Sequence, residues 1–184
     1  MSKRLALLSA AAFGALALTA TITAPVSAEE KTVMVGGAAM FPSKNIIQNA
    51  VNSKDHTTLV AAVKAAGLVE TLEGKGPFTV FAPTNTAFGK LPAGTVDTLV
   101  KPENKATLTK ILTYHVVPGK LAAADLTDGM KLKTAGGQEL TVKKADGKVM
   151  IIDAKGGSST VTVANVNQSN GVIHVVDTVL MPAS

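Results

Sequence analysis

The amino-acid sequence predicts an α+β fold in which mainly helical segments precede mainly antiparallel strands. Apolar residues recur at helical spacing between residues 43 and 72. The last third of the chain instead consists of short runs rich in Val, Ile and Thr, separated by turns that contain Gly and Asn. No stretch after residue 42 has the length and composition of an interdomain linker, so we expect all these elements to form one domain.

Helices account for the first part of this fold. Ser43 can cap a helix that contains the apolar residues between 46 and 51. A second helix is expected to begin at residues 55–57 and to end at Gly67, because glycine is the usual residue after a helix C-terminus. Residues 68–72 add one more turn.

The middle of the chain alternates between the two kinds of structure. Residues 78–81 form a short apolar strand between Gly-Pro and Ala-Pro pairs. Thr84 can then cap a short helix that ends before Pro92, because the residue before a proline disfavours the helical conformation. Two further helical segments are expected at 95–100 and 106–113, followed by a strand at 114–117.

Strands and hairpins make up the rest. Residues 140–144 and 149–152 flank Asp146-Gly147, a turn pair that tolerates the positive φ of a two-residue hairpin. A third strand covers residues 160–163. A fourth covers residues 172–179 after the turn at Asn170-Gly171.

The first 28 residues have the layout of a secretory signal. A basic start at Lys3 and Arg4 precedes an uncharged apolar run, and small residues end it at Ala28. Such a run could also anchor a protein in a membrane, but Pro25 interrupts it before the small-residue site. We therefore expect cleavage after Ala28, export to the periplasm or the medium, no stable membrane anchor after cleavage, and a flexible leader over residues 29–42.

Composition excludes several functional classes. The chain has no cysteine, so disulfides, thiolate metal sites and cysteine nucleophiles are excluded. The net charge of +5 is mild, and Arg4 is the single arginine of the sequence. Without clustered Arg and interleaved aromatic residues, we expect no nucleic-acid partner.

Three segments together resemble the fasciclin (FAS1) domain family. They are GPFTVFAPTNTAF at 76–88, LTYHVVPG at 112–119 and NGVIHVVDTVLMP at 170–182. They occur in the order and with the spacing of that family, and the resemblance extends over residues 43–182. Three ordered motifs within one domain are far more specific than any one of them alone.

This resemblance implies a β-wedge of mainly antiparallel strands with helices packed over one side. It also implies an adhesion or extracellular-matrix interaction module that binds a cell-surface or matrix protein or a glycan. Neither catalysis nor a cofactor is implied. The chain resembles the small secreted bacterial members with a single domain, and we expect a monomer.

Most of the motif residues are expected to be structural. Phe78 and Phe81 lie three residues apart, so on a regular strand their rings face opposite sides. The Asn85 amide is placed to bond nearby backbone in its turn. The residues assigned a mainly structural role are Phe78, Phe81, Pro83, Thr84, Asn85, Phe88, His174 and Asp177.

Tyr114 and His115 are the candidate partner-binding residues. The resemblance implies this, because the neighbourhood of the Tyr-His segment is linked to adhesion in the family. On the predicted strand the two side chains alternate, so one is expected to be buried and the other accessible. Lys120 and Asp125 are their expected exposed neighbours.

Two other functions remain open at this point. A small secreted hydrolase would use His115 or His174 as the general base and Asp125 or Asp177 as the acid that orients this base. However, no Gly-x-Ser-x-Gly nucleophile motif is present. An envelope protein could alternatively bind a lipid or another small ligand between helices and sheet. The histidines lie too far apart in the sequence to indicate a metal site. His56 is expected to lie at a helix start.

Overall fold

The computed structural model describes residues 31–183. The predicted signal peptide and the first two residues of the predicted leader, 29 and 30, lie outside the described residues. Within them, the helices are α1 (Ile46–Ala50), α2 (Thr57–Ala66), α3 (Val69–Glu73), α4 (Asn85–Gly89), α5 (Thr95–Leu99) and α6 (Lys105–Tyr114), with 3₁₀ turns η1 (Lys54–His56) and η2 (Pro102–Asn104). The strands are β1 (Val33–Val35), β2 (Ala38–Met40), β3 (Phe78–Pro83), β4 (Val116–Pro118), β5 (Lys131–Lys133), β6 (Glu139–Ala145), β7 (Lys148–Ile152), β8 (Ser158–Gln168) and β9 (Gly171–Val176).

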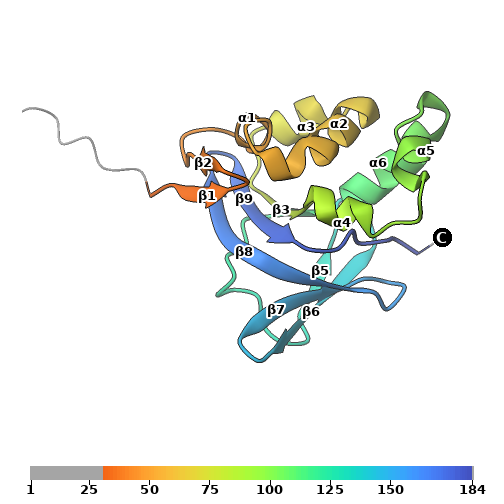
Figure 1. Cartoon of the computed structure of the whole chain (residues 1–184). Helices are drawn as coiled ribbons and strands as arrows, with labels where there is room; N and C mark the ends of the chain where they lie inside the picture. Colours follow the sequence, from red (N-terminus) through yellow and green to blue (C-terminus); the bar gives the residue numbers. More distant parts are fainter. Residues whose placement is uncertain (1–30, 184) are drawn as a thin grey trace, which may run out of the picture.

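The main sheet of the described chain has seven strands in the order β4-β3-β9-β8-β7-β6-β5. Every neighbouring pair is antiparallel except β3 and β9, which run parallel. The helices lie over one side of β3 and β9, and β5 to β7 curve beneath the other side (Figure 1). The predicted α+β wedge of mainly antiparallel strands is therefore confirmed.

Two apolar clusters fill the two sides of the sheet. The helical-side cluster packs helices against the sheet and includes Leu59, Val63, Leu72, Phe88, Leu112 and Ile173. The strand-side cluster lies on the opposite face and comprises Phe81, Tyr114, Val117, Leu126, Leu132, Leu140, Val142, Ile151, Val176 and Leu180. Phe78 packs against the helical-side cluster, so the two rings of β3 face opposite sides, as their spacing predicts.

Local signals in the sequence place several element ends correctly. Gly67 follows α2 with φ +72°, the left-handed conformation that glycine adopts without steric cost. The Thr84 hydroxyl accepts a hydrogen bond from the Ala87 amide and caps α4. Asp146 and Gly147 both have positive φ, +52° and +73°, and join β6 to β7 as the hairpin turn requires.

The segment at 29–42, which the sequence predicts to be a flexible leader, instead contains the β1–β2 hairpin. Gly36 and Gly37 take φ of +58° and +74°, which suits a two-residue turn. Val35 and Met40 are buried in the helical-side cluster. The expectation of flexibility was wrong because two short apolar runs around a Gly-Gly turn bury their inward side chains against the rest of the domain.

Three smaller corrections concern element ends. Asn45, rather than Ser43, caps α1: its side chain accepts from the Gln48 amide while Gln48 bonds back to the Asn45 amide. The predicted strand at 114–117 begins only at Val116, because Tyr114 completes the last turn of α6. The edge strand β5 was missed because three residues carry too short an alternating pattern.

Candidate functional site

The end of α6 places Tyr114 and His115 inside the molecule. His115 is the C-cap residue of α6, and its amide donates to the Leu112 carbonyl. Tyr114 is fully buried and His115 is 2% exposed. The expectation that one of the two is accessible was wrong, because consecutive residues at a helix end do not alternate as they do on a strand. Neither side chain can touch a partner directly.

The His115 ring joins α6 to the segment after β9. Its Nδ1 lies 2.8 Å from the Ile111 carbonyl oxygen and donates to it. Its Nε2 then accepts a hydrogen bond of 2.9 Å from the Leu180 amide. Burial lowers the pKa of His115 to about 4, although the Ile111 bond and the charge of Asp153 oppose this. The neutral ring therefore serves as a structural link.

The Tyr114 hydroxyl makes an equivalent link on the strand side. It donates to the Glu139 carbonyl at 3.2 Å and accepts from the Ala154 amide at 2.8 Å. It thus connects the start of β6 to the loop after β7. Burial raises the pKa of this phenol, so the hydroxyl keeps its proton under ordinary conditions.

The exposed feature of this region is the loop of residues 119–125, which follows β4. Its first half is bonded to buried side chains of the sheet. The Thr79 hydroxyl donates to the Gly119 carbonyl at 2.6 Å and accepts from the Leu121 amide at 2.9 Å. His174 on β9 donates from Nε2 to the Leu121 carbonyl at 2.8 Å.

His174 is positioned in turn by its own neighbours. Its ring stacks on Phe81 with centroids 5.7 Å apart. Its Nδ1 accepts from the Asn165 amide at 3.4 Å. Burial lowers the pKa of His174, so the ring is neutral and bonded at both nitrogens. The stacked rings of His174 and Phe81 thus form part of the buried support beneath the loop.

The second half of the loop is held by one side chain of β8 and by one side chain of the loop itself. The Asn165 side chain accepts from the Ala123 amide at 2.7 Å, and Asp125 accepts from the Ala122 amide at 2.9 Å. Asn165 has φ +59°, a conformation that asparagine tolerates better than most residues. Lys120, Ala124 and Asp125 remain exposed. The loop is therefore fixed by buried side chains of the sheet in its first half and by hydrogen bonds at the surface in its second half.

Sequence reasoning missed Thr79 and Asn165, the two side chains that bond the loop. Thr79 lies inside an apolar strand, where a buried hydroxyl must find a hydrogen-bond partner. Asn165 interrupts the β-branched run of β8 at the point where the register with β9 shifts. Both signals are visible in the sequence, but neither identifies the partner across the fold.

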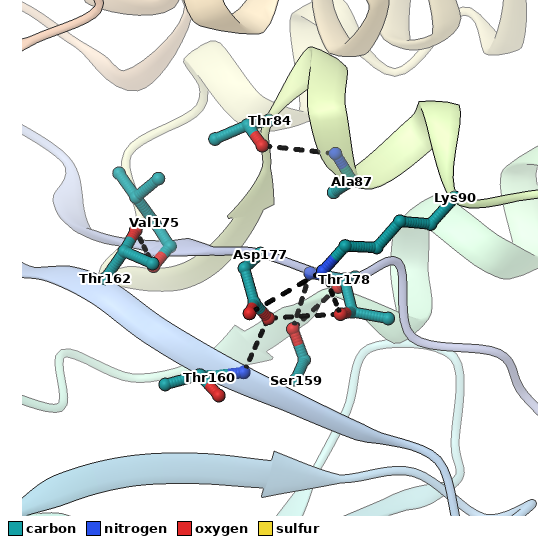
Figure 2. Close-up of polar contacts among 9 residues, drawn as sticks. All are labelled: Thr84, Ala87, Lys90, Ser159, Thr160, Thr162, Val175, Asp177 and Thr178. Carbon is teal, nitrogen blue, oxygen red and sulfur yellow. Dashed lines mark hydrogen bonds and ion pairs between the residues drawn. The ribbon is translucent and has the colours of Figure 1, made fainter.

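Asp177 forms a second polar cluster at the end of β9 (Figure 2). Its carboxylate accepts from the Thr160 amide at 2.8 Å and the Thr178 hydroxyl at 3.1 Å, and Lys90 lies 3.7 Å away. Burial alone would raise the pKa of Asp177, but these bonds and the Lys90 charge hold it below its usual value. The cluster ties β9, β8 and the end of α4 together.

The arrangement does not support the hydrolase alternative. Ser159 is fully buried, and its hydroxyl donates to the Thr178 carbonyl at 2.7 Å. Both nitrogens of His174 and of His115 bond to backbone groups, so neither ring faces a serine hydroxyl. Within residues 31–183, no cluster of three or more His, Asp or Glu side chains is arranged to hold a metal ion.

The remaining motif residues join α4 to its surroundings. Asn85 bonds distant backbone rather than its own turn: it accepts from the Thr58 amide at 3.0 Å and donates to the Lys54 carbonyl at 2.8 Å. Pro83 is buried and pairs with Val176 across β3 and β9. Phe88 is buried in the helical-side cluster. Asn85 thereby joins the start of α4 to η1 and the start of α2.

Comparison with known proteins agrees with the motifs and the fold. The family model described as the fasciclin domain matches residues 54–182. The chain is 49% identical over 168 residues to protein sll1483 of Synechocystis, covering 91% of this chain and 90% of that protein. It is 34% identical over 194 residues to immunogenic protein MPB70 of Mycobacterium bovis, covering 95% and 94% of the two chains.

Two further relatives are described by name as cell-surface or adhesion proteins. Cell surface glycolipoprotein MPB83 of Mycobacterium bovis is 39% identical over 153 residues, 80% of this chain and 64% of that protein. A FAS1 domain pair from the insect cell adhesion molecule Fasciclin I has the same fold, with a TM-score of 0.68 and 19% identity. That match covers 77% of this chain and about half, 52%, of the insect chain.

This chain belongs to the fasciclin domain family. The family is one of adhesion and extracellular-interaction modules, and its relatives include cell-surface proteins. No helix within residues 31–183 combines the length and the apolar character needed to cross a membrane.

Proposed function

We propose that the protein is a secreted or periplasmic adhesion module that contacts its partner through the loop of residues 119–125. The observation that carries this proposal is the fixed loop itself. Buried Thr79 and His174 and the Asn165 side chain all bond its backbone, while Lys120 and Ala124 face solvent. A surface that is already ordered loses little conformational freedom on binding.

The proposed partner is a protein or a glycan on a cell surface or in an extracellular matrix. Lys120 supplies a positive charge and Asp125 a negative one at opposite ends of the loop. The exposed Ala124 between them has a small side chain, so a partner can approach the loop closely. The chemistry is that of recognition without catalysis, and export by the predicted signal peptide would place the domain where such partners occur.

The test measures binding of purified residues 29–184 to intact cells and to isolated envelope polymers. Wild-type protein is compared with Ala124→Trp, which adds a large ring to the exposed loop, and with Ala61→Trp, the same change on the exposed face of α2. We expect saturable binding that Ala124→Trp weakens about tenfold or more and Ala61→Trp leaves unchanged, because steric exclusion acts only at the contact surface.

A heat-unfolded sample separates folded recognition from nonspecific adsorption. Equal binding by both tryptophan variants would contradict the assignment to the loop while retaining adhesion. Wild-type binding no stronger than that of the unfolded sample would contradict adhesion to those partners.

A further inference from the structure

The outer surface of strands β5, β6 and β7 carries a group of lysines that lies apart from the loop just described. Alternate residues of these strands, among them Leu132, Leu140 and Ile151, belong to the strand-side cluster. The residues between them point to the opposite surface, because successive side chains of a strand alternate. In Figure 1, β6 and β7 lie at the bottom of the view, away from the helices.

This surface, called the lysine face below, is defined by four exposed lysines. They are Lys131 and Lys133 from β5, Lys143 from β6 and Lys148 from β7. Lys144 does not belong to the face. It follows Lys143 directly and points to the other side, where its ammonium group donates to the Ala123 carbonyl at 3.4 Å.

The strand register arranges three of these lysines in a line. Lys131 lies opposite Thr141, which makes Lys143 its diagonal neighbour on the adjacent strand. Lys143 lies opposite Met150, which makes Lys148 the next diagonal neighbour. Diagonal neighbours on one face of an antiparallel pair lie about 7–8 Å apart. The positive charges therefore follow one another across adjacent strands at a nearly regular interval.

Most of this positive charge is uncompensated. Glu139 is the single acidic residue of β5, β6 and β7, and its carboxylate lies 3.5 Å from the Lys131 ammonium group. Among residues 31–183, Lys133, Lys143 and Lys148 form no ion pair. Like charges at this spacing repel, because it does not exceed the Debye length of about 8 Å at physiological ionic strength. A polyanion on the face would relieve the repulsion.

Protection of a sheet edge explains only part of the lysine face. Lysines on an edge strand discourage pairing with another chain, which accounts for the two lysines of β5. Strands β6 and β7 are paired on both sides, so Lys143 and Lys148 protect no edge. Asp146 lies in the turn between these two strands, yet it forms no ion pair with either lysine. The line of charges therefore needs another explanation.

The other side chains of the face disfavour three kinds of anionic partner. Strands β5, β6 and β7 contain no aromatic residue and no arginine, so nucleic-acid bases find no stacking surface and phosphates no bidentate contact. The exposed large apolar side chains of the described chain belong to other segments, so the face has none to insert into a lipid surface. Met150 and Ile152 are half-buried and provide no protruding anchor for a protein interface.

An acidic polysaccharide suits the same features. Each lysine ammonium group acts as a point charge that can pair with one carboxylate or sulfate of the polymer. Thr141 and Thr160 share the face with the lysines through their positions in the strand register, and their hydroxyls both donate and accept hydrogen bonds. Sugar hydroxyls can therefore be bonded between the paired charges.

We propose that the lysine face binds an acidic polysaccharide, which lies across β5, β6 and β7 along the line of Lys131, Lys143 and Lys148. Repeated charge along the polymer matches repeated charge along the line. The site is independent of the loop at 119–125, because none of its residues belongs to that loop.

The experiment titrates residues 29–184 with polygalacturonate and with the methyl ester of the same polymer, which lacks the charge. We expect polygalacturonate to bind at least about tenfold more tightly than the ester, because the ester offers no ionic contact. Calorimetry at about 50 mM and about 200 mM salt should show at least about a tenfold loss of affinity for polygalacturonate. Amide NMR shifts should be confined to β5, β6, β7 and the adjoining part of β8.

Two double variants separate the lysine face from the overall charge of the protein. Lys143→Gln combined with Lys148→Gln removes two of the four lysines of the face without breaking an ion pair. We expect about tenfold weaker binding and about half the dependence of log Kd on log salt. Lys64→Gln combined with Lys110→Gln removes the same charge from exposed positions on α2 and α6 and should leave the affinity within about twofold.

The loop variant Ala124→Trp distinguishes this site from the proposed adhesion surface. It is expected to bind polygalacturonate as the wild type does, whatever its effect on binding to cells. All variants of this experiment change exposed side chains, and unchanged circular dichroism and Tm verify that they fold.

Four results would overturn the proposal. They are no binding of polygalacturonate at the lower salt concentration, equal affinity for its methyl ester, equal weakening by the two double variants, and NMR shifts outside the lysine face. Tighter binding to phosphatidylglycerol vesicles or to single-stranded DNA than to polygalacturonate would overturn the choice of a polysaccharide and assign the face to a membrane or a nucleic acid instead.

Discussion

The two faces of the sheet differ in how completely the packing encloses their buried polar groups. On the strand side, the Tyr114 hydroxyl and both ring nitrogens of His174 reach backbone partners, and the packing encloses them completely. On the helical side, the His56 ring bonds to the Ser53 hydroxyl and lies beside a small apolar cavity. Fully paired polar groups specify one arrangement of the chain, whereas the packing around His56 is less complete.

The elements on the two sides explain this difference. The strand-side cluster is bounded by the hydrogen-bonded strands β5 to β7 and closed by Leu180 from the C-terminal segment. The helical-side cluster is covered by short helices and by the β1–β2 hairpin, which contact the main sheet without strand pairing to it. We expect the strand side to be the more rigid of the two.

The largest expected effect tests this difference by removing one leucine from each side. Leu140→Ala on the strand side should lower the free energy of unfolding by about 4 kcal/mol, since a fully enclosed site cannot collapse around the lost volume. Leu59→Ala beside the cavity should cost about 2.5 kcal/mol, because its wall is already incompletely packed. Urea unfolding of both variants measures the two values.

Equal losses for the two leucine variants would show that the two sides are packed equally well. A larger loss for Leu59→Ala would reverse the comparison. Unchanged urea m-values would confirm that both variants unfold from the same compact state.

The second-largest expected effect is a loss of stability in mild acid, which arises because His115 is buried as a neutral ring. Its pKa is about 4 in the folded protein and near 6.5 when unfolded, so between these values the unfolded chain binds more protons. Stability is therefore full above pH 6.5 and falls with decreasing pH, by about 3 kcal/mol down to pH 4. Urea unfolding at several pH values measures the slope, to which His56 and His174 add in the same direction.

The His115→Gln variant isolates the part that His115 contributes. Near pH 5 its slope should be shallower than that of the wild type by about 1.4 kcal/mol per pH unit, because one fewer proton is taken up on unfolding. Carboxylates titrate in both proteins and cancel in the difference. Identical slopes would contradict the burial of a neutral ring at this position.

The smallest effect concerns the hairpin over the cavity. Gly36→Ala places a Cβ at φ +58° against the Ser53 side chain, and 2.8 Å from the Asp55 amide nitrogen. We expect a loss of about 2 kcal/mol, roughly 1 kcal/mol more than for Gly37→Ala, because the contacts at Gly36 add to the cost of a positive φ. Faster amide exchange should be confined to β1, β2 and η1, as measured by hydrogen exchange. Gly37→Ala is the control, because its Cβ would meet no neighbour although its φ is also positive.

Uniform acceleration of exchange across the domain would show that the hairpin does not open on its own. The same loss for Gly36→Ala and Gly37→Ala would show that backbone conformation alone, rather than contact with Ser53, sets the cost.

The sequence by itself determined the α+β class, most element ends and the family. Gly67, Thr84 and Asp146-Gly147 act within a few residues of themselves, so their effects can be predicted from local steric and hydrogen-bonding rules. The opposite orientation of Phe78 and Phe81 follows from the same local geometry of a strand.

Only the tertiary structure decided the site. Tyr114 and His115 lie at the junction of a helix and a strand, and their local sequence pattern is compatible with either conformation. The helix continues through Tyr114, whose side chain packs in the strand-side cluster. Asn165 and Leu121 meet their partners across 42 and 53 residues of sequence. The burial of His56 likewise comes from segments far along the chain that pack around it. Pairings and packing over such distances depend on how all elements come together, and no short stretch of sequence contains that information.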